Sequence, residues 1–379
     1  MADSNLAFLS LILIFPLSLL VFLYLIVSPK PVRIPIKGRH VFITGGSSGI
    51  GLAMARQAAA EGARVSILAR NRDKLEEAKQ SIHLSTGIDV AVFSADVRDF
   101  AAVKAAVEEA GPVDVLVCNQ GVFVPQELES QELEEVKFMI DVNLMGTFHL
   151  IKAALNGMKN RRDRGPASIA IMSSQAGQVG IYGYTAYSAS KFGLRGMAEA
   201  LQQEVIADNI HISLIFPPDT ETPGLEEGQH VYSCCGGLEL EIRNNFGENK
   251  KRPQLTSIIA ASSGAMKADE VAKKALDGIK SGSFIVPCNF EGLLLTIATA
   301  GLSPQGSYLM AFVEVVTAGI VRLAGLCFQW NWYGSIEKWH AQKKYNPGNF
   351  ELDTRTVLCM AAFGDYNRFL SIHEDGSCN

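Results

Sequence analysis

Tyr187 and Lys191 are the residues of this chain whose types and spacing most directly suggest chemistry. They open an apolar helical pattern, and residues four positions apart lie on the same face of a helix. A lysine ammonium beside a phenol is expected to lower the pKa of the tyrosine from about 10, so that the phenol can exchange a proton near neutral pH. Because the same spacing occurs by chance in surface pairs, the surrounding sequence must decide.

Two polar residues upstream are candidates for the same site. Ser174 directly follows a predicted strand at 168–172. Its hydroxyl could hydrogen-bond a substrate carbonyl as negative charge develops on the oxygen. Asn143 lies inside an apolar helical pattern, where an asparagine is expected to be either exposed or functional.

A glycine-rich stretch nearer the N-terminus is typical of a phosphate-binding turn. Residues 44–51 read TGGSSGIG, between a predicted strand at 40–44 and an alanine-rich helical pattern at 52–61. Glycine lets the backbone turn sharply and approach a pyrophosphate, and the next helix N-terminus offers free N–H groups. Outside this context the pattern would indicate only a tight turn. The predicted cofactor contacts in this stretch are Gly45, Ser47, Ser48, Gly49, Ile50 and Gly51.

The residue after the second predicted strand, 64–69, indicates which dinucleotide would bind. An acidic residue there would accept hydrogen bonds from a ribose 2′-hydroxyl and select NAD. Arg70 is cationic instead and could pair with a 2′-phosphate, to which Ser47 and Lys74 could add contacts. The alternative is a solvated surface arginine. The sequence favours NADPH.

Later strand ends are expected to complete the cofactor site. Asp96 comes just past the third predicted strand, 89–94, and is placed to contact the adenine. Asn119 and Gly121 follow the fourth, 113–118, at the carboxyl edge of the sheet, where such folds bind ligands. An asparagine there could also be only a turn former.

The elements that position these residues alternate regularly between short β-branched runs and helical patterns. Such alternation with short links predicts an α/β fold of the Rossmann type, a doubly wound parallel sheet with right-handed crossovers. The net charge of −5, without a basic stripe, argues against nucleic-acid binding. The seven cysteines lack metal-ligand spacing, which predicts no metal site and suits a reducing compartment.

An N-terminal stretch at about 6–27 contains no charged residue and is long enough to cross a hydrocarbon core of about 30 Å. Acidic Asp3 precedes it, basic residues follow it, and no small-residue cleavage site is evident, so we expect a retained anchor rather than a signal peptide. The basic flank places the following domain in the cytosol. Pro16 leaves open a kink or a hairpin.

A second apolar zone, 290–330, is interrupted at 303–306 and contains Glu314 and Arg322. Charge at mid-bilayer is costly. Two arrangements therefore stay open: an amphipathic helix packed on the domain or lying in the membrane interface, and a membrane hairpin. The expected division of the chain is an anchor with its basic flank at 1–37, a catalytic domain at 38–289, this membrane-associated segment, and a polar tail at 331–379.

Over about residues 38–290 the chain resembles the short-chain dehydrogenase/reductase family. The shared features are the glycine stretch at 44–51, Asn119 to Gly121, Asn143, Ser174, and Tyr187 with Lys191. The resemblance implies hydride transfer from NADPH to a carbonyl carbon. It further implies that Tyr187 protonates the substrate oxygen, Ser174 orients it, Lys191 also holds the nicotinamide ribose, and Asn143 anchors a water in a proton relay.

One loop departs from the family pattern. After the predicted strand at 211–216 the family usually has Pro-Gly, whereas this chain has Pro217-Pro218. The second proline makes this backbone stiffer. Thr220 and Thr222 keep the positions expected to meet the nicotinamide amide and the phosphates.

This loop, the 174–178 stretch and the two hydrophobic ends resemble a subfamily of endoplasmic reticulum membrane enzymes that reduce the 3-keto group of long-chain sphingoid bases. The resemblance implies a sphingoid ketone as substrate, a cytosol-facing catalytic domain and, as is common in the family, a homo-oligomer. Asp219 and Glu221 are candidates to bind the substrate amine, or are merely solvated or capping carboxylates. The alternatives are a membrane-bound steroid or retinol dehydrogenase and a non-catalytic NADP-binding scaffold.

Overall fold

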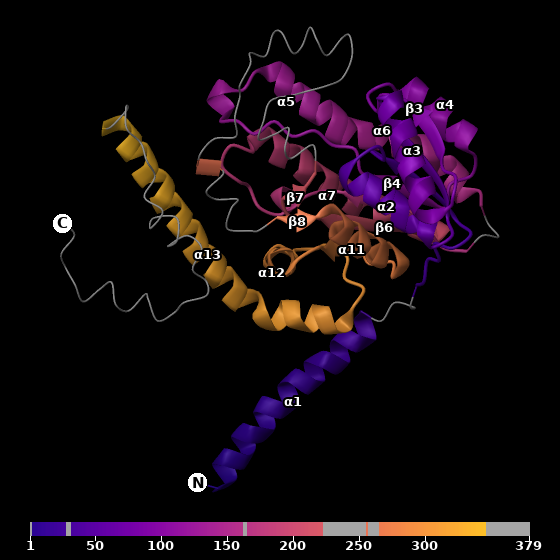
Figure 1. Ribbon diagram of the computed structural model, residues 1–379. Coiled ribbons are helices and arrows are strands. Elements are labelled where there is room, and N and C mark those ends of the chain that lie inside the picture. The colour runs from indigo at the N-terminus through magenta and orange to yellow at the C-terminus, as the bar shows by residue number, and fades with distance from the viewer. Residues whose placement is uncertain (1, 28–31, 162–164, 223–254, 257–264, 346–379) are drawn as a thin grey trace.

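The catalytic domain is built on one parallel sheet. The structure, a computed structural model, describes residues 2–27, 32–161, 165–222, 255–256 and 265–345 (Figure 1). Within these residues the main sheet has seven strands in the order β3-β2-β1-β4-β5-β6-β9, and every neighbouring pair is parallel. The strands are β1 (His40–Thr44), β2 (Arg64–Ala69), β3 (Ala91–Ser94), β4 (Val115–Cys118), β5 (Ala167–Met172), β6 (Ile210–Phe216) and β9 (Ile285–Pro287).

The strand order reverses between β1 and β4, which confirms the predicted doubly wound sheet. Ligands bind such sheets at the carboxyl ends of the strands where the order reverses. The loops that follow β1 and β4 contain the glycine stretch and Asn119. The topology therefore brings both predicted cofactor segments to one crevice.

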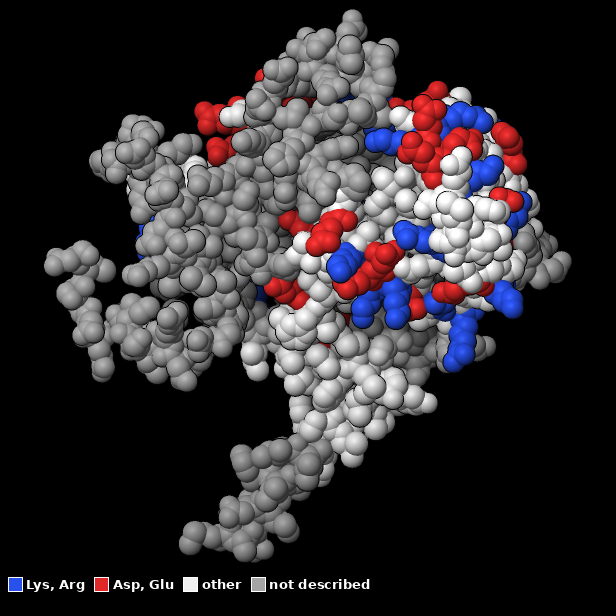
Figure 2. Space-filling model, viewed as in Figure 1, with Lys and Arg blue, Asp and Glu red and all other residues white. Residues whose placement is uncertain are grey.

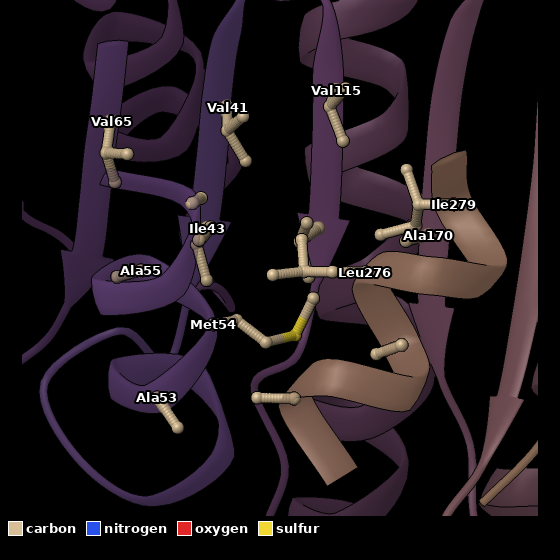
Figure 3. Close-up of a cluster of buried hydrophobic side chains, with 14 of the residues drawn as sticks. Val41, Ile43, Ala53, Met54, Ala55, Val65, Val115, Ala170, Leu276 and Ile279 are labelled. Atoms are coloured by element: carbon tan, nitrogen blue, oxygen red, sulfur yellow. The ribbon is translucent and has the colours of Figure 1, made fainter. Parts of the chain in front are cut away.

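Helices cover both faces of the sheet because alternate strand residues point to opposite sides. Val41 and Ile43 of β1 point to one apolar core, where Met54 and Leu276 cover them (Figure 3), whereas Phe42 points to the other. The first core is covered by α2 (Gly49–Ala60), α3 (Arg72–Thr86) and α11 (Ala268–Lys280). The second is covered by α4 (Phe100–Ala110), α6 (Gly146–Lys159) and α7 (Thr185–Val205).

The helix that contains Asn143 is not a regular α-helix. It begins as α5 (Leu133–Met139), widens into the π-helical turn η2 (Ile140–Met145), and continues as α6. Such π-turns insert one extra residue per turn and often lie at functional sites. The remaining short elements are η1 (Leu128–Ser130), η3 (Gln175–Gly177), η4 (Ile206–Asp208), β7 (Thr220–Glu221) and β8 (Met266–Lys267).

The two apolar ends form helices that contact each other. Helix α1 (Ala2–Ile26) projects from the domain. Helix α13 (Tyr308–Tyr345) begins below α12 and then rises along the left side of the domain in this view (Figure 1). The ring of Tyr24 meets that of Tyr308 edge-on, with centroids 5.3 Å apart. Most described side chains of α1 from Ile14 onward are apolar and exposed, as are many of α13. These surfaces are compatible with membrane association.

The second apolar zone differs in detail from the sequence pattern. Its first segment forms α12 (Phe290–Ala298), which at about 1.5 Å per residue is too short to cross a bilayer. It packs on the domain, the first of the two arrangements left open. Its second segment, α13, continues to Tyr345, past residue 330; residues 346–379 of the expected tail lie outside the described residues.

Candidate active site

Tyr187 and Lys191 lie in the first two turns of α7, beside the carboxyl end of β5. The Lys191 ammonium is buried and donates a hydrogen bond to the carbonyl oxygen of Met172, 3.0 Å away. Its Nζ lies 5.5 Å from the centre of the Tyr187 ring. The helix thus presents both side chains to one site, as their spacing predicts.

The pKa values of this pair differ from the sequence expectation. Burial raises the pKa of Tyr187 to about 12, with a hydrogen bond to Ser174 opposing the rise and the charge of Asp219 adding to it. The pKa of Tyr187 is thus raised, not lowered as its spacing from Lys191 predicts, because burial outweighs the other influences. Burial also lowers the pKa of Lys191 to about 8. Tyr187 is therefore a neutral phenol at neutral pH, the form that can donate a proton.

Ser174 lies between strand β5 and the short turn η3. Its hydroxyl hydrogen-bonds to that of Tyr187 and accepts a hydrogen bond from the Ala176 amide at 3.2 Å. Both hydroxyls can therefore reach the same substrate oxygen. This arrangement suits the polarisation of a carbonyl.

Asn143 occupies the centre of the π-helical turn, and its side chain is fully buried. Its Nδ2 donates to the carbonyl oxygen of Val122 and to Ser190 Oγ, both at 3.0 Å, and its Oδ1 accepts from the Val122 amide at 2.8 Å. The side chain thus links the loop after β4 to the catalytic helix. Its proposed role in holding a water stays a prediction.

A buried polar chain connects the glycine stretch with Asn143. The hydroxyl of Thr44 donates to Gln120 Oε1 at 2.6 Å, and Gln120 Nε2 donates to the hydroxyl of Thr147 at 2.9 Å. Thr147 in turn donates to the backbone carbonyl of Asn143 at 2.8 Å. The sequence analysis named Gln120 only within the motif Asn119 to Gly121 and gave it no role. Its position directly after a strand that is predicted to be buried was the available signal.

Aromatic rings that the sequence analysis did not identify pack against Tyr187. Phe123 packs edge-on against both Tyr187 and Tyr184, with centroids 4.8 Å apart in each pair. The position of Tyr184, three residues before Tyr187, places both rings at the start of α7. These rings exclude water from one side of the phenol.

The glycine stretch forms a cradle that fits a dinucleotide pyrophosphate. Gly45 and Gly49 have positive φ angles of 63° and 55°. A Cβ at Gly51 would lie 2.2 Å from the Gly45 carbonyl oxygen and 2.6 Å from Asn119 Nδ2. The N-cap residue of α2, Ser48, makes no side-chain capping bond, so the first amides of this helix are available to an anion.

Replacing Gly51 with alanine should abolish this cradle. Because the added Cβ would meet backbone, we expect NADPH affinity to fall by about tenfold or more and the free energy of unfolding to fall by about 2 kcal/mol. Isothermal titration with NADPH and thermal unfolding measure both. Gly157→Ala is the matched control, since nothing lies within 4 Å of a Cβ there; it should bind normally, and equal losses in both variants would contradict the assignment.

Of the residues predicted to meet a 2′-phosphate, Arg70 and Lys74 follow β2, whereas Ser47 lies in the loop after β1. The side chain of Arg70 is exposed, and those of Lys74 and Ser47 are partly buried. Burial alone would raise the pKa of Asp96, but hydrogen bonds and charge from Arg98, with the charge of Arg70, hold it below its usual range. Asp96 forms a two-pronged ion pair with Arg98, with Oδ2 2.6 Å from Nη2. Its expected contact with adenine thus has a competing partner within the protein.

Asn119 and the loop after β6 border the cradle. Asn119 Nδ2 donates to the carbonyl oxygen of Thr44 at 3.1 Å, so its side chain braces the glycine stretch. A Cβ at Gly49 would lie 3.0 Å from Thr222 Cγ2, which places Thr222 across the cradle. The hydroxyl of Thr220 instead donates to the Pro218 carbonyl at 2.9 Å within its own loop. Gly121 is exposed near Lys191, its Cβ position being 3.6 Å from Nζ.

The chain is similar to proteins of known sequence and structure. The sequence profile described as short chain dehydrogenase matches residues 39–231. A solved structure titled short chain dehydrogenase/reductase family protein superposes with a TM-score of 0.52 at 26% identity, covering 68% of this chain and 98% of that one.

Full-length relatives resemble the chain more closely. A protein named 3-dehydrosphinganine reductase from Arabidopsis thaliana is 62% identical over 88% of this chain and 94% of its own length. A protein of the same name from Danio rerio is 36% identical over 83% of this chain and 90% of its own length. The likeness extends beyond the residues that the family profile matches.

Proposed function

The chain belongs to the short-chain dehydrogenase family, and on that premise we propose that it reduces 3-dehydrosphinganine to sphinganine with NADPH, a step of sphingolipid synthesis. The observation that carries the proposal is the 62% identity to an Arabidopsis thaliana protein of that activity name over 88% of the chain. The grouping of Ser174, Tyr187 and Lys191 supports the chemistry.

The proposed reaction adds a hydride to the ketone carbon and a proton to its oxygen. The reduced nicotinamide supplies the hydride when it is bound. Ser174 and Tyr187 hydrogen-bond the ketone oxygen, and Tyr187 gives its phenolic proton to that oxygen as it becomes an alkoxide. Lys191 stabilises the resulting phenolate by its charge and holds the nicotinamide ribose. A phenol that is neutral at neutral pH suits this direction of the reaction.

The preference for NADPH over NADH rests on Arg70. Arg70→Asp should reverse it, since a carboxylate repels a 2′-phosphate and accepts hydrogen bonds from a 2′-hydroxyl. We expect KM for NADPH to rise about tenfold or more, with KM for NADH unchanged or lower. Steady-state kinetics with each cofactor measure the ratio. A variant that still prefers NADPH to the original degree would contradict this role.

Asp219 is proposed to bind the cationic amine beside the substrate ketone. It lies in the loop after β6, and the effect of its charge, which raises the pKa of Tyr187, supports this role. Asp219→Asn should raise KM for the amino ketone about tenfold, because a charge-assisted hydrogen bond is lost. KM for an analogue that lacks the amine should not change. An unchanged KM for the amino ketone would exclude this role. Glu221→Gln, at an exposed position, is the matched variant because Glu221 is the other candidate for the amine.

Attachment to the endoplasmic reticulum membrane with a cytosol-facing domain is proposed from the apolar ends. The exposed apolar surfaces of α1 and α13 support this attachment. The proposed substrate supports it too, because a long alkyl chain gains about 0.8 kcal/mol per buried CH₂ and therefore stays in the bilayer. A homo-oligomer is proposed through α6 and α7. Exposed Met145, Phe148 and Phe192 on or beside these helices support such a contact.

Complementation in cells tests the proposed function. Cells that lack their own 3-dehydrosphinganine reductase and depend on added sphinganine should grow without it when they express this chain. Expression of the Tyr187→Phe variant should not restore growth, because it lacks the proton donor. Rescue by the variant would favour a non-catalytic scaffold. Failure of the unchanged chain, if present at the membrane, would favour another substrate, such as a steroid or retinal.

A further inference from the structure

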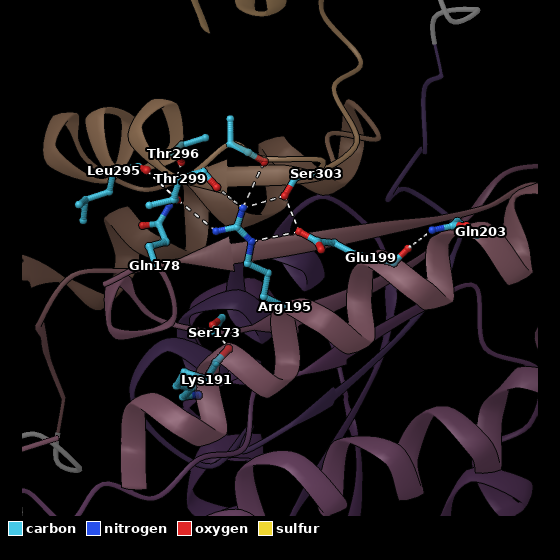
Figure 4. A network of polar contacts seen from close by, with 11 residues as sticks. Ser173, Gln178, Lys191, Arg195, Glu199, Gln203, Leu295, Thr296, Thr299 and Ser303 are labelled. Atoms are coloured by element: carbon cyan, nitrogen blue, oxygen red, sulfur yellow. Dashed lines mark hydrogen bonds and ion pairs between the residues drawn. The ribbon is translucent and has the colours of Figure 1, made fainter. Parts of the chain in front are cut away.

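Beyond its catalytic residues, helix α7 is hydrogen-bonded to the segment that follows α12. We call the contacts of Arg195 with Thr299 and Ser303 the Arg195 clamp. Arg195 lies one helical turn after Lys191 and donates to the hydroxyls of Thr299 at 3.1 Å and Ser303 at 2.8 Å, and to the Thr299 carbonyl (Figure 4). Glu199, a turn further on, pairs with Arg195 at 3.0 Å. Thus α7 holds the segment that leaves the C-terminal end of α12.

The turn that follows Ser174 holds the rest of α12. Gln175 Nε2 donates at 2.8 Å to Asn289 Oδ1, which also accepts from the Gly292 amide and caps the helix. Gln178 Nε2 donates at 2.9 Å to the hydroxyl of Thr296 (Figure 4). Helix α7 and the turn after Ser174, which supply the catalytic groups, therefore both form hydrogen bonds with α12 or its flanking residues. These bonds lie at the beginning, middle and end of α12.

The opposite side of α12 is apolar and faces solvent. Gly292 and Thr296 are buried on the side that faces Gln175 and Gln178, whereas Phe290 is 71% exposed and Leu294 41%. Leu302, in the segment that Arg195 holds, is fully exposed. An exposed apolar face on a helix that several hydrogen bonds fix in place indicates that an apolar partner covers this face.

The neighbouring elements indicate that this partner is a lipid surface. Helix α12 packs against α13, which contacts α1 through Tyr308 and Tyr24. Figure 2 shows an area without charged side chains where α1 leaves the domain, with Lys, Arg, Asp and Glu side chains above it. The segment after α1 is fixed to the domain by the Ile34 amide, which donates to the Lys280 carbonyl at 2.9 Å. An exposed apolar face that adjoins two helices with exposed apolar side chains matches a lipid surface.

We propose that α12 lies in the membrane surface and, through the Arg195 clamp, sets the height of the active site above the bilayer from which the substrate is drawn. The inference rests on the proposed function and deepens it, since it assigns the contact through which a membrane-borne ketone is presented to Tyr187. Arg195 is a positioning residue in this scheme.

The test compares one substrate in the membrane with one in water. The full chain with Phe290→Glu and Leu294→Glu is assayed in vesicles of phosphatidylcholine and phosphatidylserine that carry 3-dehydrosphinganine, and separately with a short-chain, water-soluble 2-amino-3-ketone. We expect kcat/KM to fall roughly tenfold for the vesicle-borne ketone and to stay within about twofold for the soluble one. Leu84→Glu, at a still more exposed apolar site on α3, is the control and should change neither value.

Each other outcome has a defined meaning. Unchanged activity in vesicles, or equal losses on both ketones, would overturn the inference. A change of oligomeric mass in the double variant would show that a second copy covers the face instead, and would also overturn it. If the unchanged protein reduced neither ketone, the proposed function itself would fail. If it reduced only the soluble one, the chemistry would stand and membrane presentation would fail.

A third variant tests the clamp itself. Arg195→Met should reproduce the selective loss on the vesicle-borne ketone, because α12 is then no longer fixed to α7. When Arg195→Met is added to the Phe290 and Leu294 substitutions, kcat/KM for the vesicle-borne ketone should fall little further. Both changes disrupt the same contact between the active site and the membrane. Additive losses would show that Arg195 acts independently of the membrane face and would contradict the clamp.

Discussion

Replacing Tyr187 with phenylalanine is expected to lower kcat for ketone reduction by about 10³-fold, because proton donation by a positioned acid contributes roughly 10²–10⁴-fold. The ring and its packing against Phe123 would be kept, so NADPH affinity should stay within about twofold. Single-turnover absorbance at the nicotinamide band measures the chemical step, and fluorescence titration measures NADPH binding.

The neighbouring tyrosine provides the control for this substitution. Tyr184→Phe removes a hydroxyl from a ring 5.9 Å from that of Tyr187 and should cost no more than about 1 kcal/mol of stability, with kcat nearly unchanged. If Tyr187→Phe retained full kcat, or if Tyr184→Phe lost as much, the acid would have been assigned to the wrong residue.

Replacing Lys191 with methionine is expected to remove activity and yet stabilise the fold. Loss of the ammonium should lower kcat/KM by about 10²-fold or more, since neither the ribose nor the developing phenolate is then held by a positive charge. The folded protein, however, buries this ammonium and lowers its pKa from 10.5 to about 8. Removing a buried charge should therefore raise the free energy of unfolding at pH 7, by about 2 kcal/mol after allowance for the lost bond to Met172.

The pH dependence gives the sign of this effect. Between pH 8 and 10.5 the unfolded chain binds more protons at Lys191 than the folded protein does, so the stability of the unchanged protein should rise with pH across this window. The stability advantage of Lys191→Met should be complete below pH 8 and vanish above 10.5. Activity should move oppositely, with kcat/KM for NADPH falling as pH rises through about 8.

Denaturant unfolding at several pH values measures this difference. Lys104→Met, at an exposed position with a helical ion pair to Glu108, is the control and should change stability by less than about 0.5 kcal/mol at any pH. A Lys191→Met variant that is destabilised at neutral pH would mean that the ammonium is held by stronger contacts than the bond to Met172 provides.

The sequence predicted the fold and the grouping of the candidate site residues because both depend on local patterns; their catalytic roles stay predictions. Alternating apolar runs and helical patterns define the parallel sheet, whose topology brings the ends of β1 and β4 together. The four-residue spacing places Tyr187 and Lys191 on one helix face, and the end of β5 carries Ser174 beside them. No long-range information was needed for these predictions.

The errors and omissions concern properties that depend on tertiary packing. The pKa of Tyr187 is governed by burial, which the Tyr–Lys spacing does not reveal. The chain from Thr44 through Gln120 to Thr147 joins residues that are distant in sequence. So does the Arg195 clamp, whose partners follow it by about a hundred residues. A helical surface arginine is the ordinary interpretation of that position from sequence alone.

The most direct test of the account is a comparison of substrates with the purified full chain and NADPH. 3-Dehydrosphinganine, retinal, and 3-keto and 11-keto steroids are supplied separately in the same vesicles, and the alcohols formed are quantified by mass spectrometry. The account predicts sphinganine as the main product, with kcat/KM at least about a hundredfold above that for any other ketone or aldehyde. Formation of retinol or a hydroxysteroid at an equal or greater kcat/KM would contradict it.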